Sequence, residues 1–510
     1  MPQPPTASWP RRDAAHLLVS SGQMAELEQQ LFASGLPLEA LMEKAALAVS
    51  QELLKPSATG DPGPQPLLQQ RLQRHGALVL VGPGHNGGDG LVVARELHLA
   101  GLPVRIWSPF ERHKPLTESH LRHARWLGIP CLDDPPEAHD PALWIDGLFG
   151  IGQRHDPGAA LSQLLAERQQ QQPGQLVAID GPTGLCADSG SLLAGAAACA
   201  ATTYAIGLLK QGWLQASALR WVGQLLRLDL GLPSQLLATL PGEQPLGLDA
   251  SDLKTAPWPH PAADASKYER GRLLVVAGSR RYLGAAHLAL AGASASGCGS
   301  LRATVPEELA QQLWQQRPEV VINTAGLERL DAVLFGPGIG ATGEAGSSER
   351  PSWQQLQAFS GLLLLDADGL NQLARAGPAA LAWLQGRCGP TWITPHCAEF
   401  GRLFPDLADL PPLEAAPSAA QRSGATVLLK GPRSVIACPA GRRWQLLQAF
   451  PQAARAGLGD VLAGYAAGLG AMAMAACQRA DGALLAAAAL AHAQAGRGGG
   501  APLAIASRLG

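Results

Sequence analysis

The chain has 510 residues, more than one ordinary hydrophobic core accommodates, so two domains are expected. Its 39 lysines and arginines nearly balance 41 aspartates and glutamates, which gives a formal net charge of −2. A chain so close to neutrality has no overall field that would draw it to nucleic acid or an anionic membrane. Small molecules are therefore its expected partners.

Cysteine usage and the chain's apolar segments exclude further classes. The eight cysteines form no CxxC pair, which argues against a zinc or redox motif and favours reduced thiols in a cytoplasmic protein. The opening sequence MPQPPTASWPRRD lacks the apolar stretch of a secretory signal and is expected to fray. The uncharged run 461–477 is short for a bilayer span and rich in Ala and Gly, so we expect a buried helix there.

In the first half of the chain, short apolar runs that end in glycine-rich turns alternate with helical stretches. Such alternation predicts βαβ units around a parallel sheet, here a Rossmann-like layer. The strand-then-turn runs are ALVLVGPGHNGGDG (77–90), PVRIWSPF (103–110), ALWIDGLFG (142–150) and LVAIDGPTG (176–184).

The same pattern restarts after a proline-rich stretch of weak periodicity, 231–265, which suits a linker. We therefore expect an α/β domain at 15–230 and a second α/β domain at 266–510. The strand-then-turn runs of the second are GRLLVVAGS (271–279), AVLFGPGIG (332–340), GLLLLDADGLN (361–371), TWITPH (391–396) and TVLLKGPRSVIA (426–437).

The first glycine-rich turn, 82–90, follows a strand and is expected to open a helix at Leu91. Backbone N–H groups and the positive end of a helix can hold an anion at such a turn. A turn without a ligand is the plain alternative for a GxG alone. The polar residues Asn86 and Asp89 within it favour a site.

Two later loops, 146–152 and 180–185, also follow predicted strands. The carboxyl ends of parallel strands line one crevice, so Asn86, Asp146, Asp180 and Thr183 are expected to converge. Taken singly, each Asp is better explained as an N-cap or turn former, whereas together they favour a site. Together, carboxylate, amide and hydroxyl oxygens form a set suited to an alkali or alkaline-earth cation.

These three loops resemble the NNxGDG, DxxxGTG and DIPSGL segments of the NAD(P)H-hydrate epimerases, and the resemblance covers nearly all of 17–230. It implies that Asn86, Asp146 and Thr183 bind potassium, and Asp180 is the candidate acid/base group. This sequence has His85, Gly181 and Thr183 where the family has Asn, Ile and Ser. The implied contacts with the nicotinamide hydrate are His85, Asn86, Gly87, Gly88, Asp89, Gly150, Ile151, Gly152, Gln153, Arg154, His155, Asp156 and Asp180.

The strongest signal in the second half is the turn 457–464, GLGDVLAG, which leads into an apolar helix. Its backbone amides are suited to a phosphate, and Asp460 would sit where it can take a proton from an attacking hydroxyl. Kinases of the ribokinase-like fold arrange a GxGD segment in this way. A simple helix cap is the alternative.

Together with GPGxG, DAD, TPHxxE and an LKG loop, this turn resembles the ADP-dependent NAD(P)H-hydrate dehydratases over about 265–495. The resemblance implies a ribokinase-like α/β domain. Leu458 replaces a Thr or Ser of the family, and Arg455 replaces a small residue. The implied substrate contacts are Ala285, Gly340, His396 and Asp460, and the implied nucleotide contacts are Lys430, Gly431, Pro432, Arg433, Ser434 and Gly459.

Both resemblances imply one substrate, hydrated NADH or NADPH (NADHX, NADPHX), whose C6 hydroxyl has R and S forms. The first domain would interconvert these forms with K⁺ bound. The second would dehydrate the S form with ADP as co-substrate, Mg²⁺ accompanying the nucleotide, and release AMP and phosphate. We expect a cytoplasmic homo-oligomer that binds neither nucleic acid nor membrane.

Two alternatives remain at this point. The second domain would be a ribokinase-like small-molecule kinase if Asp460 activated a vitamin or sugar hydroxyl toward ATP, although TPHxxE and DAD argue against this. Either half would be a nucleotide-binding scaffold without turnover if His85 or Leu458 has removed its activity.

Overall fold

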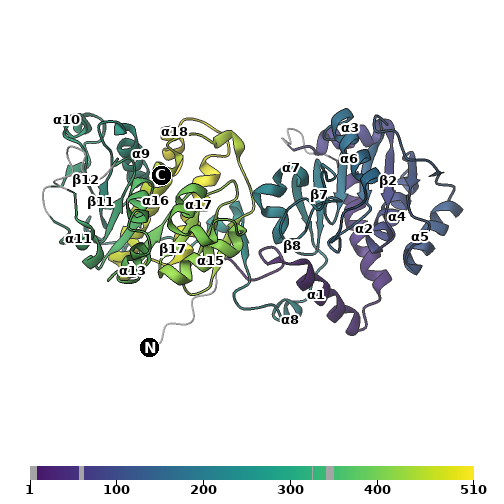
Figure 1. Cartoon of the computed structure of the whole chain (residues 1–510), viewed down its shortest axis with the longest axis horizontal. Coiled ribbons are helices and arrows are strands. Elements are labelled where there is room, and N and C mark those ends of the chain that lie inside the picture. The colour runs from purple at the N-terminus through teal and green to yellow at the C-terminus, as the bar shows by residue number, and fades with distance from the viewer. Residues whose placement is uncertain (1–8, 57–62, 324–325, 341–349) are drawn as a thin grey trace. The chain divides into compact units, whose positions relative to one another are not determined.

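The computed structural model describes residues 9–56, 63–323, 326–340 and 350–510 (Figure 1). Most of the N-terminal segment expected to fray, residues 1–8, lies outside the described residues. The chain divides into two compact units. We call Asp13–Gln244 the N-terminal unit, and Pro245–Gly510 together with Met1–Arg12 the C-terminal unit.

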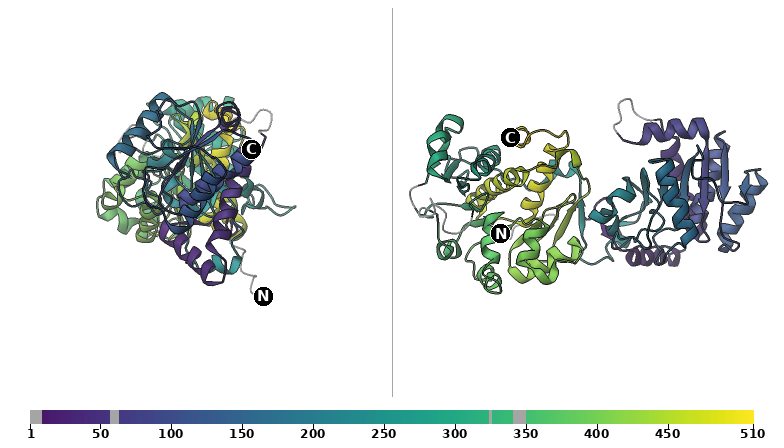
Figure 2. Two further views of the ribbon diagram at one scale, coloured as in Figure 1. Left: turned by 90° about the vertical axis from the view of Figure 1, so that its right-hand side faces the viewer. Right: turned by 45° about the horizontal axis from the view of Figure 1, so that its top comes forward.

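The N-terminal unit is built on a seven-stranded sheet in the order β4-β3-β2-β5-β6-β7-β9, and every neighbouring pair is parallel. Alternate residues of β2 serve different faces: Leu78 and Leu80 pack with Leu161 and Leu165 of α6. Helices lie on both sides of this sheet (Figure 2, left). The strands are β2 (Ala77–Val81), β3 (Val104–Trp107), β4 (Cys131–Leu132), β5 (Leu143–Gly147), β6 (Leu176–Ile179), β7 (Thr202–Ile206) and β9 (Gln224–Leu228).

A separate parallel pair joins β1 (Leu18–Val19) to β8 (Leu209–Lys210). The helices of this unit are α1 (Ser21–Ala33), α2 (Leu38–Leu54), α3 (Gln65–His75), α4 (His85–Leu99), α5 (Pro115–Trp126), α6 (Ala159–Gln171), α7 (Leu219–Val222) and α8 (Ser234–Leu237), with the short 3₁₀ turns η1 (Gln211–Leu214) and η2 (Ala216–Ala218).

The C-terminal unit has a ten-stranded sheet in the order β10-β19-β18-β17-β16-β15-β14-β11-β12-β13. The strands are β10 (Leu246–Leu248), β11 (Arg272–Val276), β12 (Ser300–Thr304), β13 (Val320–Ile322), β14 (Ala332–Phe335), β15 (Leu362–Leu365), β16 (Thr391–Ile393), β17 (Thr426–Leu429), β18 (Val435–Ala437) and β19 (Arg443–Leu446). Only β18 runs antiparallel to its neighbours among these strands. The segment between β17 and β18 is too short for a crossover, so the chain turns back as a hairpin.

Two hydrophobic cores cover the faces of this second sheet. Leu273 and Val275 of β11 belong to one core, and Leu274 and Val276 belong to the other. The first core includes residues of α9 (Leu283–Ala295), α10 (Glu307–Gln316), α16 (Leu458–Cys477) and α17 (Gly482–Ala495); the second includes residues of α11 (Trp353–Ala358), α12 (Asp368–Ala374), α13 (Ala379–Gln385), α14 (Cys397–Leu403) and α15 (Pro412–Ser423). The remaining elements are α18 (Pro502–Ala506), η3 (Ala250–Thr255), η5 (Pro405–Leu407) and η6 (Pro451–Ala453).

Helix α16 contains the uncharged run for which the sequence predicted a buried helix. Among the described helices it alone has the length and hydropathy of a membrane span, but 72% of that window is buried inside the protein. Its glycines allow α9 to approach closely, since a Cβ at Gly464 would stand 1.9 Å from the carbonyl oxygen of Ala289. The Ala- and Gly-rich composition thus reflects helix-to-helix packing in a core.

Two sequence expectations differ from the structure. Helix α4 begins at His85 rather than Leu91, because the glycines form its first turns: a Cβ at Gly87 would lie 2.0 Å from the carbonyl oxygen of Gly82. The stretch expected to be a linker, 231–265, contains α8, β10 and η3, and β10 pairs in parallel with β19. Short elements of this kind carry too few residues to show a period.

Candidate functional site

Asp146 and Thr183, two of the three residues expected to bind potassium, contact each other directly. Asp146 is the last residue but one of β5, and Thr183 lies in the loop after the neighbouring strand β6. The Thr183 hydroxyl donates to Oδ1 of Asp146 at 2.8 Å, and the Thr183 backbone N–H donates to Oδ2 at 2.8 Å. Both side chains are fully buried. The structure therefore brings these two strand ends together as expected.

Asn86, the third expected ligand, lies in the first turn of α4 beside the loop that follows β5. A Cβ at Gly150 would stand 3.4 Å from the Asn86 Oδ1 atom. The Asn86 Nδ2 atom is buried and has no hydrogen-bond acceptor among the described residues. A larger residue at 150 would therefore press on the Asn86 side chain, which places the glycine-rich loop in contact with Asn86.

The charge on Asp146 has no cationic partner among the described residues. Burial raises the pKa of Asp146 to about 6, although hydrogen bonds from Thr183 and the Leu148 N–H favour its ionised form. An added cation would favour the ionised form further. No group of three His, Cys, Asp or Glu side chains positioned for a metal occurs in the described part of the chain. One carboxylate with neutral oxygens is instead a donor set for an alkali or alkaline-earth cation.

Asp180 follows β6 and adopts a left-handed backbone conformation, with φ of 51°. Its Oδ1 atom accepts hydrogen bonds from the Ile206 N–H at 3.0 Å and from the Lys210 ammonium at 2.6 Å. Lys210 was not predicted from the sequence. The one available signal was a lysine in the otherwise apolar segment AIGLLK, followed by Gln211-Gly212-Trp213.

Two further carboxyl groups interact with this ion pair. Burial, reinforced by the Asp180 carboxylate, raises the pKa of Glu28 on α1, while Lys210 opposes the shift. Burial, reinforced by Asp180 and Glu28, raises the pKa of Asp89 well above its usual range. Asp89 was expected at the site, whereas Glu28 was not, because nothing in a lone glutamate on an amphipathic helix marks it. The Lys210 ammonium thus interacts with two carboxyl groups, Asp180 and Glu28, while Asp89 interacts with those two carboxyl groups.

The other residues expected to contact the hydrate lie in the same two loops. His85 begins α4, and burial together with the nearby Lys114 charge lowers the pKa of its imidazole, which favours the neutral form. Gln153 accepts a hydrogen bond from the Gly184 N–H at 2.8 Å, which ties its loop to the loop after β6. Asp156 accepts from the Gly158 N–H at 2.7 Å and is exposed, as are Arg154 and His155.

In the C-terminal unit, an ion pair lies at the ends of β15 and β17. The Lys430 ammonium donates to Oδ1 of Asp366 at 2.7 Å, and the Thr394 hydroxyl donates to the same atom at 2.9 Å. Burial opposes the charge of Lys430, but Asp366 and Glu399 outweigh it and raise the pKa of this lysine. Lys430 was predicted as a nucleotide contact, and the structure also places it among carboxylates.

Asp460 lies in the first turn of α16. That helix begins directly after Gly457, whose φ of 89° favours glycine. Burial, reinforced by the Asp366 carboxylate, raises the pKa of Asp460 to about 7, while Lys430 opposes the shift. A Cβ at Gly459 would stand 3.4 Å from the Lys430 ammonium. The GLGD turn and the Lys430–Asp366 pair are therefore neighbours.

His396 caps the N-terminus of α14. Its Nδ1 atom accepts from the Ala398 N–H at 3.1 Å, and its Nε2 atom lies 3.2 Å from Oε1 of Glu399. Burial raises the pKa of Glu399, with Lys430 opposing. His396 is exposed, so the TPHxxE segment presents an imidazole at the surface above a buried carboxyl group.

The remaining expected contacts lie at neighbouring strand ends. The Gly340 N–H donates to Asp368 at 2.9 Å, and a Cβ at Gly338 would stand 2.7 Å from the Ala285 side chain. Gly431 and Pro432 are exposed, and the Gly431 N–H donates to the Ser434 hydroxyl at 3.3 Å.

His492 was missed by the sequence reading. Burial lowers the pKa of His492 to about 4, and the imidazole interacts with the backbone of Leu458 under the GLGD turn. The histidine stands on α17 in a run of alanines, far along the chain from that turn.

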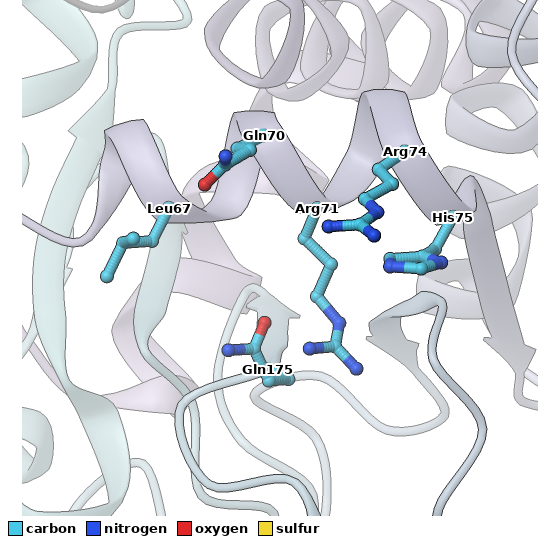
Figure 3. A pocket seen from close by; sticks show the side chains of 6 residues that line it. All are labelled: Leu67, Gln70, Arg71, Arg74, His75 and Gln175. Carbon is cyan, nitrogen blue, oxygen red and sulfur yellow. The ribbon is translucent and has the colours of Figure 1, made fainter.

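Two surface hollows lie apart from most of these residues. One, of about 490 Å³, is lined by Asp368, Asn371, Ala374, Arg375 and Arg402. The other, of about 180 Å³, lies along α3, where Figure 3 shows the Arg71 side chain extending toward Gln175. Its Arg74 and His75 occupy the last turn of α3, where the helix dipole favours positive charge, so helix stability alone explains them.

Comparison with known proteins agrees with the division into units. Residues 273–501 match the family model described as NAD(P)H-hydrate dehydratase, and residues 38–212 match the model of the YjeF-related protein N-terminus. A solved structure of an ADP/ATP-dependent NAD(P)H-hydrate dehydratase from Bacillus subtilis is 25% identical, with a TM-score of 0.42, and the match covers 51% of this chain and 94% of that chain.

Similar curated proteins span both units. The bifunctional NAD(P)H-hydrate repair enzyme of Synechocystis sp. is 40% identical over 472 residues, which cover 89% of this chain and 85% of the relative. The protein of the same description from Gloeobacter violaceus is 40% identical over 487 residues, covering 92% and 91%. The chain therefore belongs to the family of bifunctional NAD(P)H-hydrate repair enzymes.

Proposed function

We propose that the protein restores hydrated NADH and NADPH by two reactions, one in each unit. The N-terminal unit interconverts the R and S forms of the hydrate. The C-terminal unit dehydrates the S form at the expense of ADP. Family membership supports the substrate. The observation that carries the dehydration chemistry is the position of Asp460, which ends the GLGD turn and interacts with the Lys430–Asp366 pair.

In the dehydration step, the hydroxyl at C6 attacks the β-phosphorus of ADP while Asp460 takes its proton. AMP leaves, and the hydroxyl oxygen now bears a phosphoryl group. Loss of a proton from C5 and departure of phosphate with the C6–O electron pair then restore the C5–C6 double bond. A pKa of about 7 for Asp460 suits a group that must accept a proton at neutral pH.

Gly459 and the loop Lys430 to Ser434 are proposed as the nucleotide contacts, and Ala285, Gly340 and His396 as substrate contacts. Mg²⁺ would accompany the nucleotide phosphates rather than occupy a protein cage, since the described residues offer no cluster of three metal-binding side chains. The Leu458 side chain supplies no hydroxyl to a phosphate, so backbone N–H groups would hold the anion.

In the N-terminal unit, Asn86, Asp146 and Thr183 are proposed to hold K⁺, which supplies a fixed positive charge beside the hydrate. Asp180 is the proposed acid/base group, with His85 to Asp89 and Gly150 to Asp156 around the substrate. The buried Asp146 carboxylate supports this assignment, because the described residues give its charge no cationic partner.

The test is an assay of the purified protein with racemic NADPH hydrate and ADP, in K⁺ or in Na⁺, with the returning absorbance of the reduced ring as the readout. In K⁺ all of the hydrate should disappear, whereas in Na⁺ the slow phase that reports conversion of R to S should be much slower. Failure to regenerate NADPH would refute dehydration.

The assay also separates the alternatives. Phosphate found stably attached to an added vitamin or sugar would favour the kinase. If the parent consumes only the S fraction in K⁺, the N-terminal unit is a scaffold. We further propose a cytoplasmic homo-oligomer with small-molecule partners, which size-exclusion chromatography with light scattering would test.

A further inference from the structure

We infer that Lys210 is the positioning residue of the epimerase site: it fixes Oδ1 of Asp180 and leaves Oδ2 as the oxygen that carries the proton. The inference rests on the proposed epimerisation and names a residue for it. It begins from the contacts of the Lys210 ammonium, which is fully buried on β8.

The Lys210 ammonium has two hydrogen-bond acceptors and one aromatic neighbour. Lys210 donates to Oδ1 of Asp180 at 2.6 Å and to the Ile206 carbonyl at 2.8 Å, and its Nζ atom lies 5.0 Å from the centre of the Trp213 ring. An ammonium held by three partners cannot turn toward a ligand without losing one of them. Lys210 therefore acts through Asp180 rather than on a substrate directly.

The two oxygens of Asp180 are used unequally. Oδ1 accepts from both Lys210 and the Ile206 N–H, whereas Oδ2 has no hydrogen-bond donor among the described residues. The Asp180 side chain remains 13% exposed, although its partner lysine is 0% exposed. The Lys210 side of the ion pair is therefore buried, whereas the Asp180 side chain is partly exposed and its Oδ2 atom is available to a ligand.

Gly181 shows that the surroundings are fitted to this arrangement. Its φ of 113° is a glycine conformation, and a Cβ there would stand 2.6 Å from the Trp213 ring. Gly181, where the resembling family has Ile, therefore makes room for the ring that covers the Lys210 ammonium. The departure from the family motif is part of the support for the ion pair.

The neighbouring charges explain why a cation is needed. Glu28 from α1 and Asp89 from α4 both interact with Asp180, and the Asp180 carboxylate helps to raise the pKa of each. The Lys210 ammonium is hydrogen-bonded to Asp180, and it also opposes the rise in the pKa of Glu28. Loss of Lys210 would remove the ammonium that offsets the negative charge of Asp180 in this group of carboxyls.

The proton transfer follows from the chemistry of a carbon that bears both a hydroxyl and a ring nitrogen. Oδ2 takes the hydroxyl proton, the O–H electron pair forms the C=O bond, and the C6–N1 pair passes to N1, which then receives the same proton from Oδ2. Rotation about the C5–C6 bond of the open aldehyde and reversal of these steps invert C6. No oxidant or further reactant is consumed.

The experiment compares the full-length parent with Lys210→Met, using the purified R hydrate and ADP so that epimerisation limits NADPH formation. We expect kcat to fall on the order of 100-fold or more with KM little changed. The acidic limb of the pH–rate profile should move to higher pH, because a carboxylate that loses its cation holds a proton more readily. Lys44→Met, which removes an exposed lysine bound to the Leu230 carbonyl, should change neither quantity.

A structural role is separated by a second variant. Removing one partner of a buried pair destabilises a fold more than replacing both, so Asp180→Asn with Lys210→Met should recover the thermal midpoint that the single variant loses, yet remain inactive. Dehydration of the S hydrate by the same molecules reports an intact C-terminal unit, and the thermal midpoint reports the N-terminal unit. A parental pH limb and kcat in Lys210→Met, or epimerisation by the double variant, would overturn the inference. Absence of epimerisation in the parent itself would instead refute the proposed function.

Discussion

Asp460 must be ionised to accept the hydroxyl proton in the proposed dehydration. Its pKa of about 7 is raised by burial and by the Asp366 carboxylate, so the fraction of ionised base increases as pH rises through 7. We expect dehydratase kcat/KM on the S hydrate to fall about tenfold per unit below that pH. Asp460→Asn should remove turnover, on the order of 100-fold or more, while ADP still binds. A flat profile from pH 5 to 8 would contradict this role.

At this scale the sequence located single residues better than it located pairs. Asp146 and Thr183 were expected to meet because both follow parallel strands, and they do. Lys210 was missed because its ion pair with Asp180 joins residues distant in the chain and leaves no local pattern. Glu28 was missed for the same reason, since it interacts with that pair from α1. Lys430 was found through its LKG motif, but its bond to Asp366 required the positions of two strand ends.

Helix α16 shows how a single glycine fixes the spacing of two elements. A Cβ at Gly464 would stand 1.9 Å from the Ala289 carbonyl oxygen on α9, so Gly464→Ala forces the helices apart. We expect a loss of about 2 kcal/mol or more in the stability of the C-terminal unit, measured by thermal unfolding. The control is Gly284→Ala on α9. A Cβ at that position would have nothing within 4 Å, so a small gain in stability is expected.

Long apolar elements were the predictable ones. Strands such as β2 and β15 are buried along their whole length, and their runs of Val and Leu allowed them to be predicted as strands. The start of α4 was wrong because glycines normally signal a turn, whereas here they let the first helical turn pack against the Gly82 carbonyl. The β17–β18 hairpin was not distinguished from a parallel unit, because its apolar runs look alike in either direction.

At the scale of the whole molecule, the two proposed activities form a sequence in which the first feeds the second. Asp180→Ala should leave dehydration intact, so a racemic hydrate with ADP should be consumed only to the S fraction, apart from slow spontaneous epimerisation. Adding the parent protein afterwards should complete the reaction. Full consumption by Asp180→Ala at the parental rate would remove Asp180 from the mechanism.

The two-domain α/β organisation was predictable from the restart of the strand-then-turn pattern, but the path of the chain was not. The segment before the N-terminal unit belongs to the C-terminal unit, because Trp9 packs in that unit's core. Its Nε1 atom donates to the Asp252 carbonyl at 3.2 Å, and its own carbonyl accepts from the Trp444 indole at 3.2 Å. A single tryptophan among prolines carries no periodicity from which this could be read.

The position of Trp9 makes a prediction that separates the two units by their stability. Trp9 is only 9% exposed, so Trp9→Ala should cost the C-terminal unit about 3 kcal/mol and lower the temperature at which dehydratase activity is lost. Epimerase activity should be lost at the parental temperature, because Trp9 makes its contacts in the other unit's core. Trp126→Ala is the matched control: that side chain, on α5, is 79% exposed, so its removal should shift neither temperature appreciably. Equal shifts of both activities in Trp9→Ala would show that the first residues stabilise the chain as a whole rather than the C-terminal unit.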